Sequence, residues 1–323
     1  MPRAAKIASG MRKPIILAVL ALGTLGASGQ SSVPGIGAAR AAVIPPEAAA
    51  ESSVPGFDAA RLAFSQTGNM DLDHGNGDFS LTQFEALSFL CHPISPISGL
   101  SIMPLVDYQY TRLNFDHAPA GFPMHDEDLN ALNLSSYVMF RCAGSPWIYG
   151  GWARAQLATD FHNVNGDDFT FDIAAGAGYR FNERFTLGAG TAVININGDT
   201  TFYPGINFDW IASEHLRLGL YGPTLIAAYS LDDDWLLTFR GDPGGGVWNV
   251  TGDAGASRAI NLTSYRLGLF VSRRLTRDIW LTAGAGATVF NQIDYTLTNG
   301  SRLFKEDAGS ALFGTIALRV KAW

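Results

Sequence analysis

Charged side chains recur at alternate positions inside apolar segments of this chain, a spacing that could line a polar surface. In the stretch 168–181, Asp172 and Arg180 take one side of an extended chain, whereas Phe171 and Ile173 take the other. The same alternation predicts that the polar face of these segments and their ends carries the following charged residues: Asp107, Arg154, Asp160, Asp172, Arg180, Asp209, Arg217, Arg240, Arg266, Asp294 and Arg319.

This one-sided distribution indicates that the charged face points away from lipid. An arginine on a lipid-facing surface would cost about 2–4 kcal/mol at the bilayer midplane. Two interpretations of the charged face stay open. The residues neutralise each other along a narrow lumen, or they form a charge-lined permeation path or ligand pocket.

Cys91 and Cys142 are the only cysteines. Each follows an odd-numbered apolar segment, so both are expected at the same rim of the fold. Because the chain is expected in an oxidising compartment, we predict a disulfide between them that staples this rim. The segments before Cys91 and Cys142 flank one intervening strand. The turns that carry the two cysteines must therefore fold toward each other to form the bond. Two free thiols are the alternative.

No set of residues in the sequence predicts catalysis. All six histidines fall at predicted turns or segment ends, and His162 has no serine beside it. A hydrolase needs a nucleophile close to a base, and no such pair can be assembled. The acidic stretches 69–78 and 125–128 lack the spacing of an EF-hand and are expected to be solvated loops. We therefore expect no enzyme activity, metal site or cofactor.

The stretch from Asp168 to Asn197 predicts the element that positions the charges. Two apolar-alternating arms, each of roughly 11 to 14 residues, flank the polar turn Asn182-Glu183-Arg184. Strands of about 9–11 residues or more with one apolar face are typical of transmembrane β-barrels. The hairpin therefore favours an all-β, single antiparallel transmembrane barrel.

The chain from Asp78 onward divides into about twelve such segments, an even number as single-chain bacterial barrels require, with ten to fourteen acceptable. Residues 60–72 could be a short extra strand or part of the first one. The predicted segments are 78–90, 99–115, 132–142, 147–161, 168–181, 185–197, 200–211, 216–231, 235–251, 259–274, 279–297 and 308–322.

A recurring turn raises a problem of strand parity. Similar turns follow Arg180, Trp210, Ser230 and Arg274, and short turns of this kind should share one rim. The second and third are separated by the single segment 216–231, which is interrupted by Gly222-Pro223. Proline cannot donate to a strand ladder, so this position predicts a bulge or kink. Either the segment is two strands, or the turn serves both rims.

The N-terminus predicts export. Basic residues precede a short apolar run that ends in small residues, so we expect a cleaved signal peptide over residues 1–29, with an uncleaved anchor as the alternative. Residues 30–60 are rich in Ala, Pro and Ser and are expected to form a flexible linker or, alternatively, a plug, followed by the barrel over 61–323. The net charge of −7 and the absence of a basic patch argue against a nucleic acid partner.

Several motifs add a family resemblance over about residues 60–320. The chain resembles bacterial outer-membrane β-barrels, and within them an uncharacterised family known only as a domain of unknown function. This resemblance implies location in the cell envelope and a barrel fold, without an assigned activity. It is carried by a tyrosine-turn-LGAG hairpin at 179–190 and by the segments 202–210, 223–231, 245–248 and 310–320.

The last strand is expected to be recognised by the barrel-assembly machinery. Such signals end in an aromatic residue on the apolar parity, but Trp323 shares its parity with Lys321 and Arg319. The signal is therefore offset by one residue.

The sequence favours a passive outer-membrane channel for small polar solutes, surrounded by outer-membrane lipid, with the inward Arg and Asp residues setting its selectivity. A non-conducting structural or surface-interaction barrel is the first alternative. A secreted, soluble β-sandwich is the second. The identity of the solute does not follow from the sequence.

Overall fold

The computed structural model describes residues 57–73, 77–91, 93–117, 125–162, 164–196, 199–251, 257–297 and 301–322. They form fifteen β-strands in one sheet: β1 (Phe57–Asp71), β2 (Asp78–Phe89), β3 (Leu100–Asp116), β4 (Glu127–Arg141), β5 (Trp147–Thr159), β6 (Phe169–Arg180), β7 (Phe185–Ile196), β8 (Asp199–Ile211), β9 (Leu216–Tyr221), β10 (Thr224–Ser230), β11 (Trp235–Thr251), β12 (Ser257–Arg274), β13 (Ile279–Leu297), β14 (Arg302–Ala308) and β15 (Leu312–Ala322). A short 3-10 helix, η3 (Gly166–Asp168), precedes β6. Within these residues no helix has the length and apolar character needed to cross a membrane.

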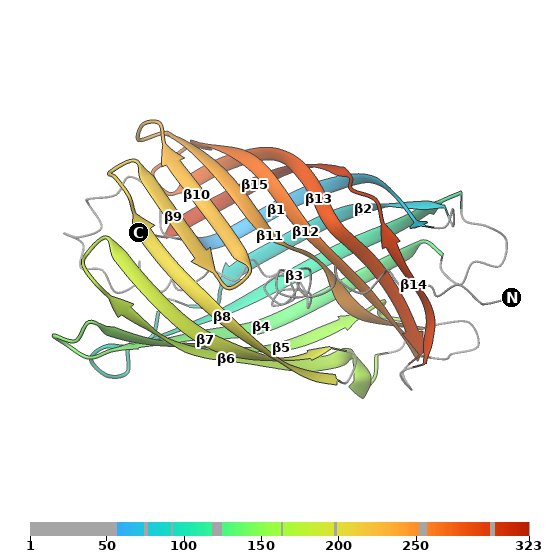
Figure 1. The fold of residues 1–323 in the computed structure, drawn as a ribbon, viewed down its shortest axis with the longest axis horizontal. Coiled ribbons are helices and arrows are strands. Elements are labelled where there is room, and N and C mark those ends of the chain that lie inside the picture. The colour runs from blue at the N-terminus through green and yellow to red at the C-terminus, as the bar shows by residue number, and fades with distance from the viewer. Residues whose placement is uncertain are drawn as a thin grey trace, which may run out of the picture.

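The sheet closes on itself as an antiparallel barrel (Figure 1). β1 pairs with β15, and β12 pairs with β13. One part of β13 pairs with β14 and the other with β15, so β14 and β15 together fill one position in the wall and the barrel has 14 strands. A single closed sheet excludes the β-sandwich alternative.

The predicted count of about twelve strands is wrong for two reasons. β1 is a complete strand that begins at Phe57, inside the end of the segment predicted as a linker. The segment 216–231 is two strands, β9 and β10, joined by a tight turn at Gly222 and Pro223. The inward parity changes from odd residues in β9 to even residues in β10 across the two-residue turn. A bulge would produce the same change, so the pattern alone hides the reversal. The predicted signal peptide, most of the linker and Trp323 lie outside the described residues.

The split of 216–231 resolves the parity problem. Turns 180–185, 211–216, 230–235 and 274–279 all lie at the end of the barrel where β1 begins and β15 ends. We call this end the terminal rim and the opposite end the far rim. Each strand residue can therefore be placed by its distance from the two rims and by whether its side chain faces inward or outward.

The wall alternates between an apolar outer face and a buried inner face. Phe171 and Ile173 on β6 are exposed, whereas Asp172 between them is buried. On β3, Tyr108 and Tyr110 alternate with the buried residues Asp107, Gln109 and Thr111. Period-two alternation is therefore present as predicted, because each strand separates the interior from the outer surface.

The β9–β10 hairpin stops midway along the barrel, as Figure 1 shows. β9 pairs with β8 only at Asn207–Ile211, and β10 pairs with β11 only as far as Gly241. The facing edges of β8 from 199 to 206 and of β11 from 242 to 251 have no ladder partner among the described residues, apart from one bridge between Asn249 and Thr159. We call this interruption the wall gap.

Candidate functional site

The interior of the barrel contains buried ion pairs between neighbouring strands. Arg154 on β5 pairs with Asp172 on β6, and both side chains are almost fully buried. Across β8 and β9, Arg217 Nε lies 2.8 Å from Asp209 Oδ1, and the Tyr221 hydroxyl donates to the same oxygen at 3.2 Å. These charges are tolerated in the interior because each has an opposite partner.

A second group of charges lies on β1, β2, β11, β12 and β15. Arg266 Nη2 lies 2.9 Å from Asp242 Oδ2, and Arg240 Nε lies 3.2 Å from Asp242 Oδ1. Asp242 therefore has two arginine partners. Arg61 pairs with Glu85, and Arg319 pairs with Asp58 at 2.8 Å. These four arginines and three acids leave one positive charge in excess.

The structure places the remaining predicted residues on the interior side or at its ends. Asp107 is buried and accepts a hydrogen bond from Asn133 Nδ2 at 3.2 Å. Asp160, just after β5, is buried at the far rim, whereas Arg180 ends β6 at the terminal rim. Asp294 pairs with Arg302 at 3.2 Å.

Sequence reasoning missed Asp58, Arg61, Glu85 and Asp242. The first two lie on or beside the segment predicted as a linker, and Asp242 lies in a glycine-rich stretch read as a bend. Glu85 was the detectable one: it shares the parity of Gln83 and Leu87, which are both buried on β2. The alternation within β2 could have predicted its position.

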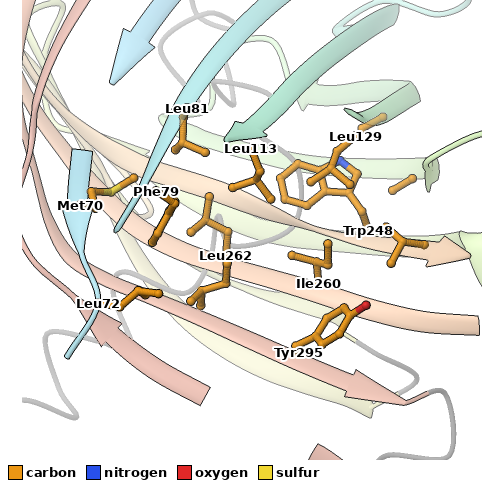
Figure 2. Packing of buried hydrophobic residues seen from close by; sticks show 14 of the residues in the cluster. Met70, Leu72, Phe79, Leu81, Leu113, Leu129, Trp248, Ile260, Leu262 and Tyr295 are labelled. Atoms are coloured by element: carbon orange, nitrogen blue, oxygen red, sulfur yellow. The ribbon is translucent and has the colours of Figure 1, made fainter. Parts of the chain in front are cut away.

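The interior at the far rim is apolar, which the sequence analysis did not predict. Figure 2 shows side chains from opposite parts of the wall packed together there. On β4 the inward face changes from Asn133 and Ser135 to Leu129 and Ala131, a switch visible in the sequence. We call this cluster the apolar plug; its buried members are Met70, Leu72, Phe79, Leu81, Leu113, Leu129, Ala131, Ala158, Trp248, Val250, Ile260, Leu262, Ile293, Tyr295 and Ala311.

The last part of β11 bends across the barrel to contribute Trp248 to the plug. Gly245 has a φ of 99°, and a Cβ atom there would lie 1.9 Å from the carbonyl oxygen of Leu262. Beyond the bend, Asn249 bridges to Thr159 at the end of β5, and the Thr251 amide donates to Asp160 Oδ2 at 2.7 Å. These contacts fix β11 against the opposite side of the barrel.

The inner faces of β6, β7 and β8 have little side-chain bulk. At Gly176 and Gly190 the atoms nearest to an added Cβ belong to the backbone of the neighbouring strand. By contrast, an added Cβ at Gly284 on β13 would lie 2.2 Å from the Phe270 ring. We call the inner face of β6–β8 the glycine wall; its small residues are Ala174, Gly176, Gly178, Gly188, Gly190, Ala192 and Gly205.

Carboxyl groups gather where β11 reaches the far rim. Glu127 begins β4, five positions before Leu132, the first exposed apolar residue of that strand, and so lies outside the apolar belt. Burial raises the pKa of the Glu127 carboxyl to about 7, and the nearby Asp160 carboxylate acts in the same direction. Burial also raises the pKa of Asp168 in η3 above its ordinary value.

The predicted disulfide is not formed in the structure. Cys91 follows β2 and Cys142 follows β4, so both lie at the terminal rim, and both are exposed free thiols. β3 separates the two strands, so the sulfurs are held on turns that are not adjacent in the sheet. Among the described residues, no three His, Cys, Asp or Glu side chains are grouped as a metal site requires.

The closed sheet, the apolar outer face and the charged interior define a barrel of the porin-like type. The chain belongs to the family described as a domain of unknown function (DUF6268), which matches residues 101–321. A comparison with curated proteins finds no match.

Solved structures of outer-membrane proteins are similar in fold. The COG4313 outer membrane channel from Pseudomonas putida F1 is 15% identical, with 86% of this chain and 99% of that chain covered at a TM-score of 0.42. A Pseudomonas aeruginosa FadL homologue is 10% identical, with 81% and 88% covered at 0.41. The KdgM porin in complex with disordered oligogalacturonate is 6% identical, with 81% and 99% covered at 0.34. Because these identities and TM-scores are low, the fold of this chain is assigned from its own strand pairings.

Proposed function

We propose that this chain is a passive channel for small polar solutes in the bacterial outer membrane, and that it is not an enzyme. Its apolar outer face would contact outer-membrane lipid. The buried ion pairs would line the solute path, and the excess arginine beside Asp242 would favour anions. Recognition of the last strand by the barrel-assembly machinery remains part of this proposal.

The glycine wall is the observation that carries the proposal. The apolar plug fills the interior at the far rim, so a polar path must pass beside it. The inner face of β6–β8 has the small side chains of the glycine wall, and it carries Asp172 and Asp209 in their ion pairs with Arg154 and Arg217. A solute would therefore move along this face.

Conductance of the refolded chain in planar bilayers tests this route. Ala174→Phe adds a large side chain on the glycine wall and should lower single-channel conductance severalfold. Ala175→Phe is the matched control, because the neighbouring side chain lies on the exposed outer face and should leave conductance unchanged. Equal effects of the two substitutions would show that the route is wrong.

The same bilayers test the role of charge. Arg266→Gln removes one of the two arginines facing Asp242, so the reversal potential in a salt gradient should shift toward cation preference. An unchanged reversal potential would show that the charges on β11 and β12 do not lie on the solute path.

A non-conducting structural barrel is the second candidate, and the apolar plug favours it. This candidate predicts a folded wild-type barrel with no conductance at all. Heat-modifiable migration in gel electrophoresis would establish that the silent protein is folded.

A further inference from the structure

We propose that the wall gap between β8 and β11 is a side passage through which an amphipathic solute moves between the barrel interior and the lipid of the outer membrane. This passage goes beyond the polar path along the glycine wall. It requires a barrel in a membrane, but it does not require ion conductance.

Each of the two strand edges at the wall gap contains a residue that is suited to an edge without a ladder partner. Pro204 lies on β8 opposite Thr191, and Pro243 lies on β11 opposite Tyr265. Proline has no amide N–H and is confined to strand positions that need no ladder bond on that side. Each free edge therefore has one fewer unsatisfied donor than an ordinary strand would have.

The margin of the gap nearer the terminal rim is held in place by side chains from both sides of the gap. Asn207 Oδ1 on β8 accepts a hydrogen bond from the Gly222 amide at 2.8 Å. The Tyr265 hydroxyl on β12 donates to the Pro223 carbonyl oxygen, also at 2.8 Å. The turn of the β9–β10 hairpin is thus fastened to both neighbours, and the hairpin ends at a defined height.

The gap lies at the depth of the apolar belt. Phe202 and Ile206 on β8 point outward along the free edge and are exposed, as is Phe171 on β6. An open strand edge is not tolerated against hydrocarbon, because its amide and carbonyl groups would have no partners there. The edges must therefore face water or a solute with hydrogen-bonding groups.

The surroundings of the gap specify the chemistry of the solute. Trp248 points into the apolar plug, so Val247 lies on the opposite face of β11, in the stretch of β11 that borders the gap. Tyr203 lies on the inner parity of β8, beside this gap. Apolar side chains between free backbone groups fit a solute with a hydrocarbon body and a polar group. The apolar plug occupies the interior at the far rim, so within the described residues the only axial exit is the path beside it along the glycine wall.

Photolabelling from the bilayer tests the passage. A photoactivatable aryl diazirine dissolved in phosphatidylcholine vesicles should label Tyr203 and Val247 as well as the lipid-facing Phe202. Buried Ser135 on β4, away from the gap, should stay unlabelled. Labelling of Phe202 without Tyr203 and Val247 in the wild-type chain would overturn the proposal, and this result needs no variant to fold.

A hairpin extension gives the matched comparison. Alternating Val and Thr residues inserted on both sides of Gly222-Pro223 would lengthen β9 and β10 along the free edges and close the gap. Labelling of Tyr203 and Val247 should then fall at least fivefold. An insertion of Gly and Ser of equal length at the same turn cannot extend the ladders and should keep the labelling. Equal labelling in both folded variants would contradict a passage at this position.

The same vesicle preparations separate this proposal from the polar channel. Loss of ion conductance with intact labelling would reject the channel alone. Conductance without labelling of Tyr203 and Val247 would reject the side passage alone.

Discussion

Glu127 stands at the far rim beside Asp160, the residue that accepts the Thr251 amide at the end of β11. Its pKa of about 7 in the folded chain exceeds the ordinary carboxyl value of 4.5. A raised folded pKa means that the contribution of this group to stability is full below pH about 4.5 and is lost as the pH rises through about 7. The far rim should therefore be less stable at pH 8 than at pH 5.

The measurement is the temperature of unfolding at these two pH values. Glu127→Gln removes the ionisation and should reduce the difference between pH 5 and pH 8. Asp233→Asn, an exposed carboxyl at the terminal rim, is the control and should keep it. If Glu127→Gln and the wild type show the same pH difference, the carboxyl does not carry it.

For single residues, the sequence predicts which side chains face the interior of the barrel in many strands. Arg154 and Asp172 could be predicted because a charge alternating with apolar neighbours can take only one face of a strand. Their pairing could not be predicted, because it depends on the register between β5 and β6. Asp242 was missed because the glycines that follow it obscure the alternation of β11.

The path of β11 depends on a single glycine. Its bend requires Gly245, whose positive φ and close approach to the Leu262 carbonyl leave no room for a side chain. Gly245→Ala should lower the free energy of unfolding by about 1–3 kcal/mol or more, because it combines backbone strain with a steric clash.

Urea unfolding of the refolded protein in lipid vesicles measures this loss. Gly314→Ala is the control, since a Cβ atom at that position meets nothing within 4 Å. Similar losses in the two variants would show that the bend of β11 does not depend on Gly245.

The elements also show where prediction from sequence stops. The strand interiors are correct because the alternation is long, as in β6 and β7. Gly222-Pro223 was recognised as a break, but periodicity alone does not distinguish a kink from a two-residue reversal. The four similar turns contained that information, since their shared rim requires the segment to be two strands.

At the scale of the whole molecule, the apolar plug separates the charged interior from the far rim. Trp248 is its largest member and is almost completely buried. Trp248→Ala should cost about 3–5 kcal/mol of stability and leave a cavity in the plug. If the plug restricts flow, the folded variant should conduct more than the wild type in the same bilayers.

Val250→Ala is the matched control, because it removes far less volume from the same strand and cluster. Unchanged conductance in folded Trp248→Ala would show that the plug does not limit permeation. The plug could not be predicted from the sequence, since it joins residues from both ends of the chain.

The seam between β1 and β15 has a consequence for how the barrel forms. Most ladders join strands that are neighbours along the chain, but Asp58 and Arg319 at the seam are 261 residues apart. The seam ladder runs from Phe57 to Thr67 with a bulge between Asp58 and Ala60. Beyond it, the Leu72–Ala308 bridge and the bond from the Gly309 amide to Asp71 continue the backbone contacts. Closure of this seam therefore bears the largest loss of chain entropy, and the regular ladder from Ala60 to Thr67 is the part of the seam able to offset it.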